Sequence, residues 1–344
     1  MSASSVSSRP SVNRQFVLAA RPTGMPDPST FNLIESPLRA LNDGELLVRA
    51  VYFSVDPYMR GRLSQSRSYA APVEVGGVMV GAAVARVVES KNPGFAVDDM
   101  VLTYMGWQEY AILDGQGLRK LDPSIPVSTA LGVLGVTGLS AYFGLLDVCD
   151  PKPGETVVVS GAAGAVGSVV GQIAKIKGCH TVGIAGGDDK VDWIKRECGF
   201  DAAFNYKKTS DYFSALRELC PKGIDVYFDN VGGPITDAVL PQINVGARIS
   251  VCGQISQYNN AKPEMGPRLL GMLIVARAKM QGFLVTDYAA RFGPALTVLT
   301  NWYRSGQLKN REDIVEGFEN LPTAFIGILK GENIGKRLVK VTES

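Results

Sequence analysis

The stretch VVVSGAAGAVGSVVGQIAK, residues 157–175, decides the fold because two structural periods meet in it around a cluster of glycines. Its opening valines are β-branched, run continuously and follow Pro153 and Gly154, which predicts a short buried strand. Beyond the glycines, apolar residues recur at helical spacing until Ile176, and Gly178 predicts the end of a helix. A strand, a tight turn and a helix are therefore expected.

The glycines of this turn indicate a phosphate-binding loop. Gly164 and Gly167 leave the backbone bare, so a pyrophosphate can approach the free N–H groups and the positive end of the following helix. The same spacing also suits a tight turn whose small residues only permit close packing of helix on strand. The motif alone leaves both interpretations open.

The sequence after residue 178 repeats the alternation of strand and helix. Strands are expected at residues 180–185, 202–205, 224–229, 247–252 and 280–285, and helices at 190–198, 211–219 and from 234 onward. With the first strand, these elements predict an α/β fold with a doubly wound, six-stranded parallel sheet of the Rossmann type. Ligands bind such sheets at the carboxyl ends of the strands, where GAAGAVG, FDNVGG and CGQISQY are expected to converge.

The end of the second strand of this sheet favours NADPH over NADH. A cofactor without a 2′-phosphate usually meets an acidic side chain there, about 20 residues past the glycines. Here the strand ends in Gly186 and Gly187, and the cation Lys190 follows in the first turn of the helix. Two structural interpretations stay open, in which Lys190 is a solvated helix residue and Asp188 is the helix cap.

The composition is that of an ordinary globular protein that is long enough for two domains. The chain has 344 residues, 46% of them hydrophobic, and a net charge of +2, which predicts no nucleic-acid partner. No apolar run approaches the roughly 18 residues of a membrane helix, and five cysteines without CxxC spacing suit a reducing cytoplasm. The first eleven residues contain six serines, which we interpret as a disordered tail rather than a transit peptide.

The sequence before the glycine turn indicates a different kind of domain. Short β-like segments at residues 45–55, 78–88 and 99–105 are separated by Pro, Gly, Asn and Asp, which predicts an irregular, barrel-like β domain. Residues 325–341, at the other end of the chain, end in a further strand. We expect this strand to return to the first domain.

Many separate motifs now point to one family. In chain order, SVDPYMRGR, GAVGSVVGQIAK, YFDNVGG, CGQISQYN and LKGENIGK resemble the medium-chain dehydrogenase/reductases. They are most similar to the zinc-free branch that contains prostaglandin and leukotriene B4 reductases, plant double-bond reductases and bacterial NADPH-dependent curcumin reductase. The resemblance implies a GroES-like β-barrel at residues 1–133 and 311–344, a Rossmann domain at 134–310, and a homodimer joined through the edge of the Rossmann sheet.

The sequence itself lacks the ligands of a zinc dehydrogenase. Catalytic zinc needs three Cys, His or Glu ligands, and structural zinc commonly needs four closely spaced cysteines. His180 is the only histidine, and no cysteine precedes Cys149. We therefore expect a metal-free enzyme in which a hydroxyl group polarises the substrate carbonyl.

Tyr258 is the candidate for that hydroxyl because it follows the fifth strand in CGQISQY and stays protonated at neutral pH. The resemblance implies that this tyrosine faces the carbonyl of an α,β-unsaturated ketone or aldehyde while hydride adds to the β-carbon. Tyr258 and the nicotinamide ribose hydroxyl would stabilise the enolate, and solvent would protonate the α-carbon. The alternative is a surface aromatic residue that happens to follow a strand.

The resemblance implies further site residues. Tyr58 would line the substrate pocket, with Asp56 or Arg60 fixing its conformation, although this loop could also be a Pro-bearing turn around a buried aromatic ring. Arg60 is also expected to contribute to substrate binding. The expected cofactor-binding residues are Gly164, Ala165, Val166 and Gly167 for the pyrophosphate, Lys190 and Tyr206 for the 2′-phosphate, and Asn230, Cys252, Gly253, Gln254, Ile255, Ser256, Tyr258, Phe283, Leu284, Val285 and Asn333 for the ribose and nicotinamide.

Three functions remain open on the sequence. The first is an NADPH-dependent enone reductase acting on a small-molecule enone or enal, and the second is an NADPH quinone oxidoreductase. The third is a dinucleotide-binding redox sensor, which would keep Gly164, Gly167 and Lys190 but would not need Tyr258.

Overall fold

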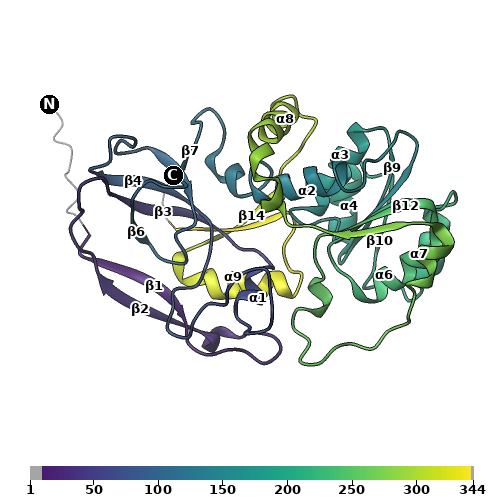
Figure 1. Cartoon of the computed structure of the whole chain (residues 1–344), viewed down its shortest axis with the longest axis horizontal. Helices are drawn as coiled ribbons and strands as arrows, with labels where there is room; N and C mark the ends of the chain where they lie inside the picture. The colour runs from purple at the N-terminus through teal and green to yellow at the C-terminus, as the bar shows by residue number, and fades with distance from the viewer. Residues whose placement is uncertain (1–9, 342–344) are drawn as a thin grey trace.

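The computed structural model describes residues 10–341 as two lobes that lie side by side (Figure 1). The part of the serine-rich tail at residues 1–9 lies outside the described residues, so the expectation of a disordered tail stays a prediction there. Among the helices within residues 10–341, none is long and apolar enough to cross a bilayer.

The first lobe is built mainly from strands of the N-terminal third and from two strands of the C-terminal segment. A seven-stranded sheet has the order β14-β15-β3-β4-β5-β7, with β6 also paired to β3, and β1 pairs with β2 in a separate two-stranded sheet. The strands are β1 (Val12–Leu18), β2 (Phe31–Pro37), β3 (Leu46–Ser54), β4 (Ala83–Ser90), β5 (Met100–Thr103), β6 (Tyr110–Leu113), β7 (Arg119–Lys120), β14 (Glu312–Glu316) and β15 (Lys336–Lys340).

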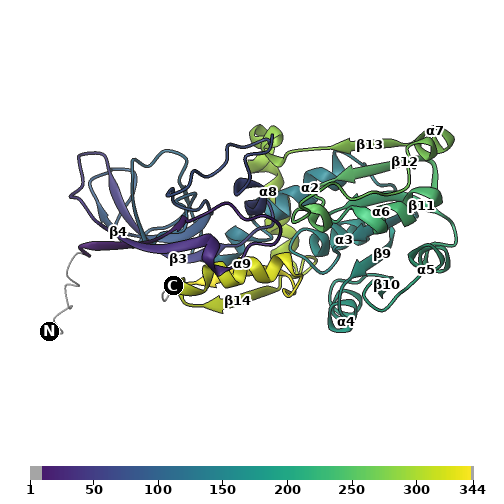
Figure 2. The same ribbon diagram turned by 90° about the horizontal axis from the view of Figure 1, so that it is seen from below.

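The C-terminal segment returns to the first lobe, as expected from the sequence. β15 pairs antiparallel with β3, and Figure 2 shows β14 and α9 (Leu321–Leu329) on the same lobe. Phe318 and Phe325 complete an aromatic cluster there, because Phe325 lies 6.0 Å from Trp107 and Phe318 lies 5.2 Å from Phe16 between ring centroids. The carboxyl end of the chain thus closes the core of the amino-terminal lobe.

The second lobe contains the predicted Rossmann sheet, with six parallel strands in the order β10-β9-β8-β11-β12-β13. This order places β8, which precedes the glycine turn, in the centre, where both faces are covered and the uninterrupted valines are buried. The strands are β8 (Thr156–Ser160), β9 (His180–Ala185), β10 (Ala202–Asn205), β11 (Ile224–Asp229), β12 (Ile243–Val251) and β13 (Lys279–Gly282).

Two strands differ in their bounds from the prediction. β12 begins at Ile243, four residues before the predicted start, because a shift of register lets Gly246 with φ of 81° lie inside the strand. β13 ends at Gly282, so residues 283–285 belong to the loop that follows it. The boundaries predicted at residues 133/134 and 310/311 for the domains stay a prediction.

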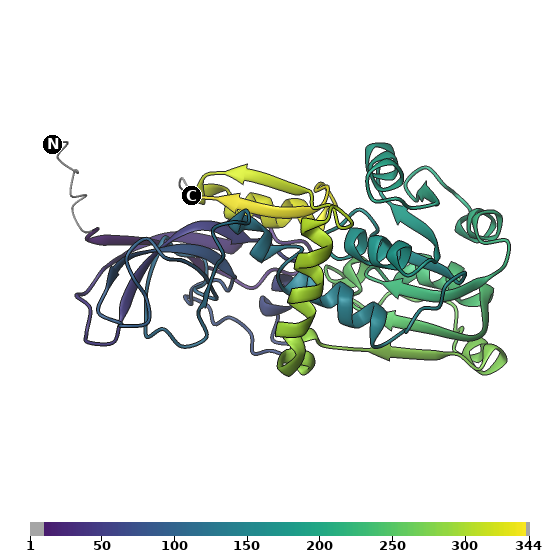
Figure 3. The same cartoon turned by 90° about the horizontal axis from the view of Figure 1, so that it is seen from above.

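Helices cover this sheet, and one of them lies between the lobes. Figure 3 shows the light green helix α8 between the two lobes, where Arg304 near its end donates to Asp122 and Ser124 of the first lobe. The helices are α1 (Met59–Arg62) in the first lobe and α2 (Val136–Leu146), α3 (Gly167–Ile176), α4 (Asp188–Arg196), α5 (Tyr212–Leu219), α6 (Gly233–Val239), α7 (Gly271–Ala276) and α8 (Phe292–Arg304).

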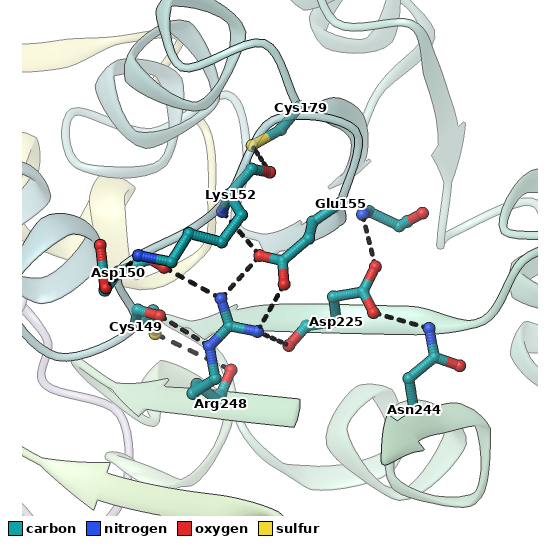
Figure 4. A network of polar contacts seen from close by, with 9 residues as sticks. Cys149, Asp150, Lys152, Glu155, Cys179, Asp225, Asn244 and Arg248 are labelled. Atoms are coloured by element: carbon teal, nitrogen blue, oxygen red, sulfur yellow. Dashed lines mark hydrogen bonds and ion pairs between the residues drawn. The ribbon is translucent and has the colours of Figure 1, made fainter. Parts of the chain in front are cut away.

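A polar network holds the amino ends of the Rossmann strands together (Figure 4). The Arg248 guanidinium donates to both carboxylate oxygens of Glu155, at 2.9 and 2.6 Å, and to the carbonyl oxygens of Cys149, Asp150 and Asp225. Burial alone would raise the pKa of Glu155, but the hydrogen bonds from Arg248 and from the Lys152 N–H, together with the charges of both residues, lower that pKa. The opposite edge of the sheet, at the carboxyl ends, carries the candidate site.

Candidate active site

The glycine turn after β8 has a free N–H group of the kind that an anion site needs. The amide of Val166 donates to no protein acceptor within residues 10–341. Such groups at the start of a helix bind phosphate, since they add direct hydrogen bonds to the positive end of the helix dipole. The turn therefore fits the pyrophosphate of a dinucleotide.

The two predicted glycines of this turn differ in how little space the fold leaves for a side chain. A Cβ atom on Gly167 would lie 2.3 Å from the carbonyl oxygen of Gly161, so Gly167 is needed for packing inside the turn. A Cβ atom on Gly164 would lie 3.2 Å from the same oxygen, which is a milder contact. Close packing is therefore a feature of this loop, and it leaves an amide free for a phosphate, so the two interpretations left open by the sequence do not exclude each other.

The end of β9 presents the cation Lys190 together with the carboxylate of Asp189. Lys190 is 9% exposed and its Nζ donates to the carbonyl oxygen of Gly331 at 2.5 Å, which leaves two ammonium protons for another acceptor. Burial lowers the pKa of Lys190, and the nearby charge of Lys207 lowers it further. Lys207 is thus a second cation beside Lys190, which the sequence interpretation missed although it directly follows Tyr206.

Asp188, the first carboxylate after this strand end, is already engaged, whereas Asp189 lies beside Gly187. Asp188 accepts hydrogen bonds from Asn205 and Lys208, and the N-cap of α4 is Gly187, so the alternative of Asp188 as the helix cap is wrong. Gly186 lies against the ring of Tyr206, because a Cβ atom on Gly186 would lie 2.8 Å from that ring. This arrangement suits a 2′-phosphate better than a ribose hydroxyl.

The loops after β11 and β12 bring the next group of predicted residues together. The Asn230 side chain donates to the carbonyl oxygen of Ser160 at 2.8 Å, and the amides of Cys252 and Gly253 both donate to the carbonyl oxygen of Asp229. Residues 252–256 therefore lie over the carboxyl ends of β8, β11 and β12. Burial raises the pKa of the Cys252 thiol to about 12, so it stays protonated and acts as a small neutral group.

Tyr258 has a fixed phenol whose proton is not used by the protein. Its hydroxyl oxygen accepts the Gln254 N–H at 3.2 Å, and a Cβ atom on Gly253 would lie 3.0 Å from that oxygen. Within residues 10–341, the hydroxyl donates to no acceptor. Burial raises the pKa of Tyr258, which keeps the group a donor at neutral pH. The geometry is that of a hydrogen-bond donor prepared for an oxyanion.

The SVDPYMRGR loop of the first lobe reaches the same region. Arg60 donates through Nε to the side-chain oxygen of Asn259 at 2.9 Å and through Nη2 to the carbonyl oxygen of Gly24 at 2.8 Å. Since Asn259 follows Tyr258 directly, Arg60 links the loop of Tyr58 to the loop of Tyr258. Arg60 is 7% exposed and its guanidinium is engaged, which favours a positioning role for Arg60 over contact with a substrate.

Tyr58 lies at the start of α1, beside tyrosines that the sequence interpretation missed. Burial raises the pKa of Tyr58, and the charges of Asp56 and Tyr104 act in the same direction, which places both near its phenol. The charge of Tyr69 likewise raises the pKa of Tyr58 and the pKa of Tyr258. Tyr69 therefore lies in the neighbourhood of both Tyr58 and Tyr258, and Tyr104 in that of Tyr58. Neither Tyr69 nor Tyr104 belongs to a motif, so only the folded chain reveals them.

The segment 331–336 joins the cofactor turn to the first lobe. Gly335 N–H donates to the Ala163 carbonyl at 2.8 Å and bridges Gly164, while the Asn333 amide donates to the Gly335 carbonyl. Asn333 is thereby placed beside the glycine turn. Lys336 follows Gly335, and its ammonium donates to the Asp56 carboxylate at 2.9 Å. Asp56 belongs to the loop of Tyr58.

The last predicted segment, residues 283–285, follows β13. The ring of Phe283 packs against α2, since a Cβ atom on Gly144 would lie 2.4 Å from it, and its centroid lies 6.4 Å from that of Phe228. The Phe283 side chain thus belongs to the core, and any contact with a cofactor would come from its backbone. Leu284 and Val285 lie at the start of a short 3₁₀ turn.

Other possible sites on the described residues are weaker. A hollow of about 330 Å³ is lined by residues of β1, β2 and β6, and its polar side chains Asn13, Gln15 and Gln108 already bond to one another. Within residues 10–341, no group of three or more His, Cys, Asp or Glu side chains could hold a metal ion. The loops at the carboxyl edge of the Rossmann sheet are therefore the candidate site.

Comparisons with known proteins find matches that cover both lobes. Residues 14–121 match a family described as the N-terminal domain of oxidoreductase, and residues 165–301 match one described as zinc-binding dehydrogenase. The putative NADP-dependent oxidoreductase YfmJ of Bacillus subtilis is 51% identical over 96% of this chain and 98% of its own. The NADPH-dependent curcumin reductase of Escherichia coli is 46% identical over 96% and 97%, and the NADP(+)-dependent 2-alkenal reductase of Nicotiana tabacum is 42% identical over 96% and 98%.

A solved structure shows the same arrangement. CurA from Vibrio vulnificus in complex with NADPH superposes with a TM-score of 0.92 at 47% identity, and the match covers 96% of this chain and 100% of that one. Close similarity over nearly the whole sequence thus accompanies the sheet order, the glycine turn and the returning C-terminal segment described above. The chain belongs to the medium-chain dehydrogenase/reductase family, in the group that includes curcumin reductase and 2-alkenal reductase.

Proposed function

We propose that this protein is an NADPH-dependent oxidoreductase that reduces the carbon–carbon double bond of α,β-unsaturated ketones and aldehydes. The observation that carries the proposal is the Tyr258 hydroxyl, which keeps its proton free at the carboxyl edge of a Rossmann sheet. The NADPH complex of CurA and the names of the curcumin and alkenal reductases support the cofactor and the substrate class.

The residues around the glycine turn would hold NADPH. The glycine turn at residues 164–167, with the free amide of Val166, suits the pyrophosphate, and Lys190 with Tyr206 suits the 2′-phosphate. Asn230, residues 252–256, the backbone of residues 283–285 and Asn333 lie at the same edge and would surround the ribose and nicotinamide. The bound cofactor supplies a hydride.

Tyr258 would stabilise the charge that forms during this reduction. As the β-carbon gains hydride, the electrons of the double bond move to the carbonyl oxygen and form an enolate. Tyr258 can donate its free proton in a hydrogen bond to that oxygen, and its position is fixed by Gln254 and Gly253. Solvent then protonates the α-carbon. Tyr58, Tyr69 and Tyr104 would line the substrate side of the cleft.

The experiment that tests this function follows NADPH oxidation with a panel of enones, alkenals and quinones. We expect steady turnover with enones and alkenals. Turnover with quinones alone would favour the quinone oxidoreductase, and binding of NADPH without turnover on any acceptor would favour a redox sensor.

Tyr258→Phe is expected to lower kcat about 10-fold for an enone while KM and NADPH affinity stay nearly unchanged. A single oxyanion donor can contribute 10²- to 10³-fold, but here the ribose hydroxyl and water share the charge. The effect belongs to kcat because the charge exists mainly in the transition state. Steady-state kinetics and NADPH fluorescence titration check this. An unchanged kcat in a folded variant would remove Tyr258 from the mechanism.

Prolonged chelation is expected to leave activity intact, because zinc would need ligands that the chain does not offer among its described residues. Activity after dialysis against a chelator, together with elemental analysis, measures this directly. Loss of activity that only added zinc restores would contradict the mechanism.

We also propose that the protein forms a homodimer in the cytoplasm. β13 is the edge strand of the Rossmann sheet, and α7 beside it exposes Ile274 and Val275 at 80% and 68%. Pairing of β13 with the same strand of a second copy would cover both the free strand edge and this apolar surface. All five cysteines are free, which suits a reducing compartment. Sedimentation velocity tests the dimer, and a monomer at micromolar concentration would contradict it.

A further inference from the structure

Arg62 lies on the surface that faces the proposed substrate pocket, but the mechanism above does not use it. Arg62 ends α1, four residues after Tyr58, so the two side chains leave the helical turn on the same face. The carbonyl oxygen of Arg62 accepts the N–H of Val73 at 2.8 Å, which brings the intervening loop with Tyr69 back over α1. Arg62 is therefore next to both tyrosines.

The guanidinium of Arg62 lacks a partner in the protein. Its Nε is inaccessible to solvent and makes no hydrogen bond, and within residues 10–341 the whole group forms neither a hydrogen bond nor an ion pair. Arg60, two residues earlier, differs from Arg62, because its guanidinium donates hydrogen bonds to Asn259 and Gly24. A partly buried cation without an acceptor is costly, and a bound ligand that supplies oxygen atoms would remove that cost.

The surroundings of Arg62 leave no protein anion to take this role. The nearest carboxylate on the same loop, Asp56, is already bound by the ammonium of Lys336 at 2.9 Å and by the hydroxyl of Ser54. Partial burial raises the pKa of Tyr58 and Tyr69, and the positive charge of Arg62 offsets part of that rise, so its field reaches both phenols. The cation thus acts on the substrate side of the cleft.

We propose that Arg62 binds a carboxylate carried by the substrate away from its reacting double bond, with Tyr58 and Tyr69 covering the chain between the two groups. A planar guanidinium with free N–H groups matches a carboxylate in two parallel hydrogen bonds. The subsite rests on the proposed enone reduction and narrows its substrates to acidic enones. The pyrophosphate and 2′-phosphate of the cofactor would be served by the glycine turn with its Val166 amide and by Lys190, at the ends of β8 and β9.

The test compares an enone that ends in a carboxylate with its methyl ester of the same length, in the full-length protein. Wild type is expected to prefer the acid. Arg62→Met should raise KM for the acid about 10- to 100-fold and leave kcat, the kinetics of the ester and NADPH affinity nearly unchanged, because the lost contact is remote from the reacting carbon. Arg62→Lys should restore part of the loss, since it keeps the charge but not the planar fork.

Arg217→Met is the matched control, because Arg217 is exposed on α5 and its replacement removes the same charge elsewhere. It should change neither substrate. Equal losses for acid and ester in Arg62→Met, with melting curves that show an intact fold, would overturn the subsite. Weaker NADPH binding would also overturn it and would assign Arg62 to the cofactor. If wild type reduced neither enone, the proposed function itself would fail and the subsite with it.

Discussion

Lys336→Met is expected to lower the free energy of unfolding by about 3–5 kcal/mol, the usual cost of removing one partner of a buried ion pair. The Lys336 side chain is 2% exposed, and its ammonium donates to Asp56 and to the Val55 carbonyl, both at 2.9 Å, and to the Arg337 carbonyl at 3.1 Å. Removing the ammonium leaves the Asp56 carboxylate, which is 16% exposed, without its cation.

This loss should be measured by urea denaturation and compared with the double variant Lys336→Met/Asp56→Asn. The double variant is expected to regain part of the stability, because it no longer carries an unpaired, largely buried charge. A loss below about 1 kcal/mol for the single variant would contradict the account of this ion pair, since that is the range of a surface pair.

The same ion pair is expected to position the substrate loop. Lys336 follows Gly335, which bonds to the glycine turn, and Asp56 precedes Tyr58 by two residues. Both Lys336 variants should therefore raise KM for an enone, including the double variant after its stability has recovered. Arg248→Met is the control, because it breaks the Glu155 pair at the opposite edge of the sheet and should reduce stability without changing KM.

Lys190→Ala is expected to weaken NADPH binding by about 1.5–3 kcal/mol, the contribution of a charge-assisted hydrogen bond, and to leave NADH nearly unaffected. The ratio of the two affinities isolates the effect on the 2′-phosphate, because both cofactors share any effect of losing the bond to the Gly331 carbonyl. Fluorescence titration with each cofactor measures it.

Lys195→Ala provides a control on the same helix, since Lys195 is exposed in the last turn of α4. It should not change the preference for NADPH. If Lys190→Ala weakened NADPH and NADH equally, Lys190 would have a structural role and the assignment of the 2′-phosphate would be contradicted.

The Rossmann sheet could be predicted from the sequence because its strands and helices carry clear periods. The return of the C-terminal strand followed from the same patterns and from the family resemblance. The start of β12 was misplaced by four residues, because a glycine can end a strand or, as Gly246 does with its positive φ, lie inside one at a shift of register. Local pattern cannot distinguish these two uses of glycine.

The candidate site was predictable only in part, and for a physical reason. Motif residues such as Lys190 and Tyr258 follow strands of a parallel sheet, so topology brings them to one edge. Tyr69 and Tyr104 lie outside the motifs, and Arg62 ends SVDPYMRGR without a sequence signal for a role of its own; all three would reach the substrate side only through the folding of the loops of the first lobe. No spacing in the sequence encodes that contact, and only the three-dimensional arrangement shows it.

The central claim is that hydride reaches the β-carbon of an enone. One enone should be reduced with NADPH that carries deuterium at the transferred position of the nicotinamide, and the product should be analysed by NMR and mass spectrometry. We expect one deuterium on the β-carbon and an intact carbonyl group. Deuterium on a carbinol carbon would show carbonyl reduction instead of double-bond reduction and would contradict the account.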